Sequence, residues 1–166
     1  MDLRTELYYD ADPVVVFAML IDEAFVARKA QATGAIRHQA SVSRDGDRVT
    51  VRLLRVMPPE VPDLIRRFVG ETVELDQIDV WEPAAADGSR TGSIRIGMAG
   101  EPVTLTSGMT LIRSVGGSST IIDAKVKASV PLVGGRIERA VHDAIARAAR
   151  IEEQVGRAWL AGEGSR

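Results

Sequence analysis

The segment IDAKVKASVPLVGGRIERAVHDAIARAARIEEQVGRAW, residues 122–159, contains the two patterns from which the architecture follows. Up to Val130, apolar or small side chains alternate with polar ones, which is typical of a strand with one buried face and one face in water. After the turn residues PLVGG, apolar side chains recur in steps of four and three over about six helical turns, at Ile137, Val141, Ala144, Ala148, Ile151, Val155 and Ala158. This segment therefore predicts a sheet whose covered face is packed by one long C-terminal helix.

A period of two also runs through most of the chain before this segment. It predicts strands over residues 2–9, 36–43, 48–56, 72–81, 91–98 and 103–111. Asp45-Gly46 and Gly116-Gly117 lie between neighbouring strands and favour tight hairpins. The strands are therefore expected to be antiparallel.

One of these strands interrupts the alternation. In residues 72–81, Leu75 and Ile78 fall on opposite sides of the strand unless one extra residue is inserted between them. We therefore predict a β-bulge near Asp76 and Gln77, which would bend the sheet.

Two short helices are predicted between the first two strands. Asp12 followed by Pro13 is a good pair for a helix start, so residues 14–21 should be helical despite their β-branched run. Asp22 can cap a second helix, which Gly34 would end.

Composition limits the classes of function. At 166 residues and 45% apolar content, the chain is expected to form a single domain over residues 1–166. It has no cysteine, which excludes disulfides and thiolate metal sites and suits the cytoplasm. A formal net charge of −2 with scattered arginines argues against nucleic acid as a partner. The longest apolar run, residues 13–21, is too short to span a bilayer, so no integral membrane association is expected.

The order of strand, two helices, antiparallel strands and closing helix resembles the helix-grip order of the START-like (SRPBCC) superfamily. The matching motifs are Asp12-Pro13, Thr33-Gly34, residues 63–70 (DLIRRFVG), Trp81-Glu82-Pro83, Asp87-Gly88, Gly100-Glu101-Pro102 and residues 131–138 (PLVGGRIE). Over residues 3–160 they resemble an uncharacterised actinobacterial branch of that superfamily. The resemblance implies an α+β helix-grip fold, in which a curved antiparallel β-sheet wraps around a long C-terminal α-helix.

The resemblance also implies an internal cavity for a small hydrophobic or amphipathic ligand of lipid or polyketide type. From the inward phases of the predicted elements, we expect the cavity to be lined by Phe25, Met57, Leu64, Phe68, Val80, Met98, Met109, Leu111, Ile137, Val141 and Ile145. Residues 57–69 are predicted either to gate the mouth of this cavity or to form an ordinary loop over the core.

A polar anchor inside the cavity is a further hypothesis. Glu152 lies near the centre of the helical stripe, and Arg55 and Arg113 extend inward phases of two strands. An inward carboxylate needs a cationic or hydrogen-bonding partner, which either arginine could supply. In the alternative, the stripe reaches the open end of the sheet at Glu152 and both arginines extend into solvent.

No catalytic or metal-binding signature is present in the sequence. His38 and His142 are its two histidines, and no cluster of His, Asp or Glu has metal-ligand spacing, so neither a metal nor a cofactor is expected. The protein is expected to be a monomer or a dimer. Three functions stay open. The first is a binding protein for a hydrophobic ligand, the second is a protein-interaction module without an open cavity, and the third is a cyclase- or dehydratase-like enzyme that uses the same pocket.

Overall fold

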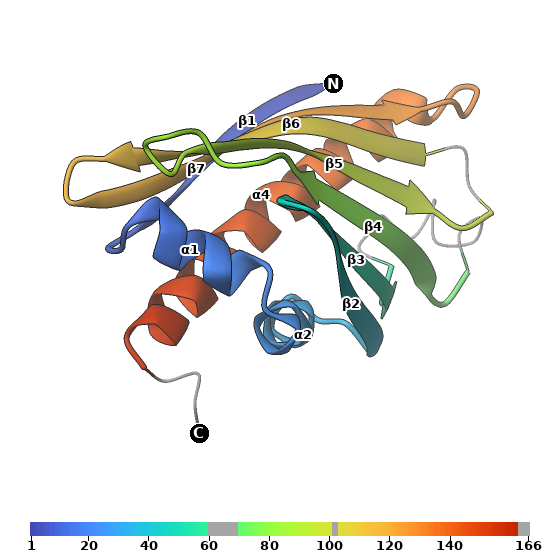
Figure 1. Ribbon diagram of the computed structural model, residues 1–166. Helices are drawn as coiled ribbons and strands as arrows, with labels where there is room; N and C mark the ends of the chain where they lie inside the picture. Colours follow the sequence, from blue (N-terminus) through green and yellow to red (C-terminus); the bar gives the residue numbers. More distant parts are fainter. Residues whose placement is uncertain (60–69, 101–102, 163–166) are drawn as a thin grey trace.

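The structure is a computed structural model that describes residues 1–59, 70–100 and 103–162 (Figure 1). Within them, the chain forms one strand, two short helices, six more strands and a long helix. The elements are β1 (Asp2–Tyr9), α1 (Pro13–Leu20), α2 (Glu23–Ala32), β2 (Arg37–Asp45), β3 (Arg48–Met57), β4 (Val73–Trp81), β5 (Arg90–Met98), β6 (Val103–Ser114), β7 (Gly117–Ala128) and α4 (Gly134–Leu160). This order confirms the predicted α+β helix-grip fold.

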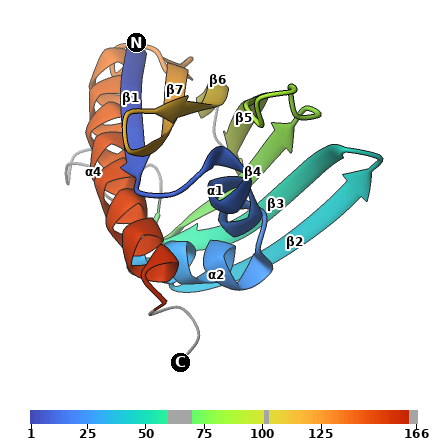
Figure 2. The same ribbon diagram turned by 60° about the vertical axis from the view of Figure 1, so that its left-hand side comes forward.

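All seven strands belong to one antiparallel sheet with the order β1-β7-β6-β5-β4-β3-β2. The sheet is curved, and α1, α2 and α4 lie on its concave side (Figure 1). Figure 2 shows α4 running alongside β1, with α2 near its C-terminal end. The long helix α4 therefore covers the sheet mainly at the β1–β7 edge.

The short helices begin where their capping residues predict. Pro13 occupies the first turn of α1, where its missing N–H leaves no hydrogen bond unmade. The Asp22 carboxylate accepts a hydrogen bond from the Ala24 N–H at 2.8 Å and caps α2. Gly34, with a φ of 92°, follows the end of α2 in a conformation that favours glycine.

The predicted bulge in β4 is wrong. β4 pairs with β3 in unbroken register from Val49 opposite Trp81 to Met57 opposite Val73, and its pairing with β5 is also continuous. Gln77 and Asp79 therefore face the covered side of the sheet. The apolar pattern failed here because polar side chains occupy two buried positions of the strand.

The largest core cluster lies beneath α1 and α2. Phe17 meets Trp81 edge to face with ring centroids 5.8 Å apart, and Phe25 meets Trp159 at 5.5 Å. Two smaller clusters, centred on Val103 with Ile137 and on Leu105 with Val126, lie toward the N-terminal half of α4. In the described part of the chain, no helix is both long and apolar enough to cross a membrane.

Candidate ligand pocket

A cavity of about 320 Å³ lies between the N-terminal half of α4 and the concave face of the sheet. Its volume is near the lower end of the range of about 300–1,000 Å³ that is usual for ligand sites. Among the described residues, its wall consists of Thr33, Arg55, Met57, Pro58, Val73, Leu75, Ile96, Met98, Val103, Thr104, Leu105, Ala140, Val141, Ala144, Ile145, Arg147, Ala148 and Ile151. Most of this wall is apolar.

Helical and strand periodicity together create the space. Ala140, Ala144 and Ala148 recur every four residues on the face of α4 that lines the cavity, and their methyl groups fill little of it. Opposite them, alternate residues of β5 and β6, such as Ile96 and Leu105, project from the sheet. The wall is therefore made of small helical and aliphatic strand side chains.

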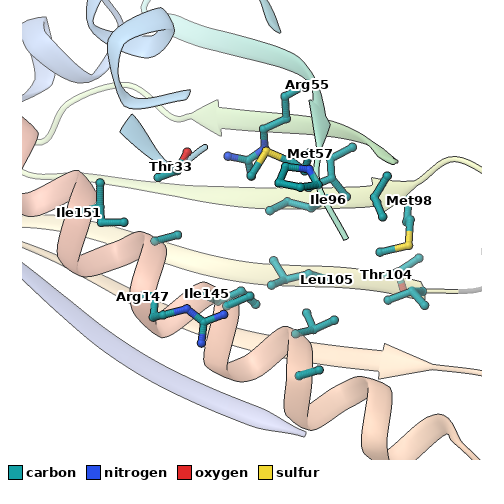
Figure 3. Close-up of a pocket in the computed structure, with 18 residues that line it drawn as sticks. Thr33, Arg55, Met57, Ile96, Met98, Thr104, Leu105, Ile145, Arg147 and Ile151 are labelled. Carbon is teal, nitrogen blue, oxygen red and sulfur yellow. The ribbon is translucent and has the colours of Figure 1, made fainter. Parts of the chain in front are cut away.

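One end of the cavity carries a half-buried cation. Figure 3 shows Arg55, from β3, at the same end as Thr33 and Ile151, with Met98 and Thr104 at the other end. Arg55 Nη2 donates a hydrogen bond to Gln77 Oε1 at 3.0 Å. Burial lowers the pKa of the Arg55 guanidinium, and the negative charges of Glu152 and Asp79 oppose this shift.

A cluster of polar side chains lies beyond this end of the cavity. Lys29 Nζ lies 3.1 Å from Glu152 Oε1, which joins α2 to α4. Gln77 Nε2 donates to Asp79 Oδ1 at 2.9 Å and to Oδ2 at 3.0 Å. Burial raises the pKa of the Asp79 carboxyl, while the Lys29 charge and the Gln77 hydrogen bond act in the opposite direction. We name Lys29, Arg55, Gln77, Asp79 and Glu152 the polar cluster.

The polar cluster separates the cavity from the aromatic core. Along the inner face of β4, Val73 and Leu75 line the cavity, Gln77 and Asp79 follow, and Trp81 belongs to the core. The same order of cavity, polar cluster and core occurs along α4. Ile151 lines the cavity, Glu152 pairs with Lys29, and Trp159 packs against Phe25 in the core.

The structure brings together some of the residues predicted to line a cavity. Met57, Met98, Val141 and Ile145 belong to its wall. The inward phases of β5 and β6 also pointed to two wall residues that the prediction omitted, Ile96 and Leu105. Leu64 and Phe68, with most of the predicted gating segment, lie outside the described residues.

The remaining predicted lining residues lie elsewhere. Phe25, Met109 and Leu111 are buried in the main core cluster, because α1 and α2 fill the space above that part of the sheet. Ile137 packs against Val103 in a smaller cluster. Val80 projects from the opposite face of β4, between the buried Asp79 and Trp81, because the strand contains no bulge.

Two of the three predicted anchor residues, Arg55 and Glu152, lie in the polar cluster, and Arg113 lies elsewhere. Glu152 reaches the polar cluster, but its ion-pair partner is Lys29 instead of an arginine. Arg113 is placed wrongly by the prediction, because it forms an exposed ion pair with Asp12 at the start of α1. Lys29 was missed, although it lies on the apolar face of α2, four residues after Phe25 and three after Val26.

The family model described as "Protein of unknown function (DUF2505)" matches residues 4–160 of the chain. The chain belongs to the DUF2505 family. This DUF2505 chain is 24% identical over 128 residues to the uncharacterized protein Rv0481c of Mycobacterium tuberculosis (strain ATCC 25618 / H37Rv), which covers 76% of this chain and 73% of that protein.

Solved structures with low sequence identity share the fold of this DUF2505 chain. A STAR-related lipid transfer protein from Xanthomonas axonopodis has a TM-score of 0.62 and 14% identity, over 96% of this chain and 85% of that one. The di-domain ARO/CYC StfQ from the steffimycin biosynthetic pathway has a TM-score of 0.65 and 8% identity, over 99% of this chain and 52% of that one. These neighbours confirm the START-like fold.

Within the described ranges, no group of three or more His, Asp or Glu side chains could hold a metal ion.

Proposed function

We propose that this DUF2505 chain binds a small hydrophobic or amphipathic molecule in the cavity between α4 and the sheet. The observation that supports this proposal most directly is the cavity itself, about 320 Å³ in volume with a mostly aliphatic wall. Concave and mainly apolar sites with a few polar groups are the usual form of small-molecule sites. Met57 and Met98 would adapt their flexible side chains to the ligand.

The chemistry of the wall favours binding over catalysis. General acid–base catalysis needs a carboxyl, imidazole or similar group within hydrogen-bonding reach of the substrate. The described part of the wall contains no Asp, Glu or His. A lipid transfer protein and a biosynthetic ARO/CYC among the structural neighbours support an apolar ligand. The absence of cysteine from the sequence supports the cytoplasm as the place of binding.

A cavity-filling substitution tests the proposal. The uncharged fluorophore N-phenyl-1-naphthylamine should bind the wild-type protein saturably at one site, with enhanced emission. Ala144→Phe places a ring inside the cavity and should weaken this binding by at least about tenfold, since the ring replaces the space for the ligand.

Ala18→Phe provides the matched control. Ala18 lies at an exposed position of α1, outside the cavity wall, so the same substitution there should leave fluorophore binding unchanged. Circular dichroism would establish that both variants are folded. Equal binding by folded Ala144→Phe and wild-type protein would refute the proposal.

A further inference from the structure

The charged groups in the cavity wall are all of one sign. In the described part of the wall, Arg55 and Arg147 carry positive charge and no carboxylate is present. Arg147 is exposed and has other interactions, whereas Arg55 is half-buried and its Nε atom is buried. An apolar cavity with a half-buried cation at one end is complementary to an amphipathic anion.

The Arg55 guanidinium has an unused hydrogen-bond donor. Its Nη2 donates to Gln77, but its buried Nε has no hydrogen-bond partner in the described structure. An unpaired buried donor is costly and uncommon, so it calls for a partner that the described residues do not supply.

The nearest carboxylates are engaged by other residues. Glu152 is paired with Lys29, and both oxygens of Asp79 accept hydrogen bonds from Gln77. No carboxylate within the described ranges forms an ion pair with Arg55.

We infer that the cavity takes an amphiphile with a carboxylate head group, which Arg55 binds at the Thr33 end while the apolar tail extends toward Met98. This inference rests on the proposed function and adds the chemical class and the orientation of the ligand. A planar guanidinium matches the two oxygens of a carboxylate.

Three probes with the same tail separate the head group from the tail. Dodecanoate, 1-dodecanol and dodecylamine would be titrated below their aggregation concentrations against protein loaded with N-phenyl-1-naphthylamine. Dodecanoate should displace the fluorophore at a concentration at least about tenfold lower than dodecanol, the effect expected for one charged hydrogen bond. Dodecylamine should bind weakest, since its ammonium group would approach Arg55.

Substitution of the arginine locates the effect. Arg55→Met should abolish the preference for dodecanoate over dodecanol, because it removes the charged hydrogen bond to the carboxylate. Arg95→Met removes the same charge from an exposed position of β5 outside the wall and should preserve the preference. If Arg55→Met does not fold, the wild-type probe series decides alone.

The outcomes distinguish the inference from the proposed function. Equal binding of dodecanoate and dodecanol to the wild-type protein would overturn the carboxylate inference and leave an apolar binding site. Tighter binding of dodecyl phosphate than of dodecanoate would overturn the choice of head group. Failure of every probe, the fluorophore included, would overturn both proposals together.

Discussion

The two ends of the interface between α4 and the sheet differ in how completely they are filled. At the C-terminal end of α4, aromatic side chains from β1, α2 and β4 pack together, among them Tyr9, Phe25 and Trp81. At the N-terminal end, aliphatic side chains and three alanines surround a cavity of about 320 Å³. No aromatic residue belongs to the described part of that wall. The cavity thus exists where small helical residues meet no aromatic partner on the sheet.

Small residues of α4 have opposite effects on packing at the two ends of the interface. Gly156 is buried against Tyr9, and a Cβ at this position would overlap Tyr9 Cε1 and lie 3.1 Å from Met19 Cε. Here the missing side chain allows close packing. Ala144, by contrast, lies on the cavity wall. A small side chain therefore makes space for a ligand only when no large neighbour occupies it.

The largest expected effect compares truncations at the two ends. Phe25→Ala should lower the free energy of unfolding by about 3–5 kcal/mol, since it leaves a new void in a filled core. Met98→Ala should cost only about 1–2 kcal/mol, since its side chain already borders empty space and only the transfer term is lost. Urea denaturation followed by tryptophan fluorescence measures both. Equal losses would mean that the two ends are packed to the same density.

A smaller difference in stability is expected between substitutions of two glycines of α4. Gly156→Ala should destabilise the protein by about 1–3 kcal/mol through overpacking against Tyr9, despite the better helix propensity of alanine. Gly135→Ala, near the start of α4, meets no atom within 4 Å and should stabilise the protein by up to about 1 kcal/mol. Thermal unfolding would show the opposite signs. A stabilising Gly156→Ala would contradict the close packing at the filled end.

Local patterns predicted the fold well. The Asp12-Pro13 helix start, the cap at Asp22, the alternation in β7 and the stripe on α4 each depend on residues close together in the sequence. Their sum was enough to predict the order of the elements and the covered face of the sheet. The resemblance to START-like proteins depended on that order.

The polar cluster could not be predicted in the same way. Lys29 and Glu152 are 123 residues apart, and no pattern within one helix reveals that they meet. Leu75 and Ile78 suggested a bulge, because the polar residues Gln77 and Asp79 occupy the buried positions that follow Leu75. Arg55 and Arg113 had the same inward phase, but only Arg55 lies on the part of the sheet that α4 and α2 cover. Such distinctions require the tertiary arrangement.

The smallest expected effect concerns the boundary between the two ends and depends on pH. Asp79 is buried in the polar cluster, where Lys29 and Arg55 attract its negative charge and Glu152 repels it. Its carboxyl pKa in the folded protein is raised above the ordinary value of 3.8. At a pH between 3.8 and this folded pKa, the folded protein therefore retains a proton that the unfolded chain has lost. The contribution of Asp79 to stability is therefore fully present below pH 3.8 and falls as the pH rises through its folded pKa.

Asp79→Asn should remove this decline and raise the stability at pH 8 by about 1 kcal/mol or less, because Lys29 and Arg55 also lose an attractive partner. Asp76, on the exposed face of the same strand, is the matched control. Its pKa is lowered by the hydrogen bond from Arg52, so its contribution is present above the ordinary value and is lost as the pH falls. Asp76→Asn should therefore reduce stability slightly at neutral pH. Urea titrations from pH 4 to pH 8 would give the slope of the free energy of unfolding against pH for each variant. A slope in Asp79→Asn equal to that of the wild type would show that Asp79 is ionised throughout this range and that the boundary between core and cavity is charged.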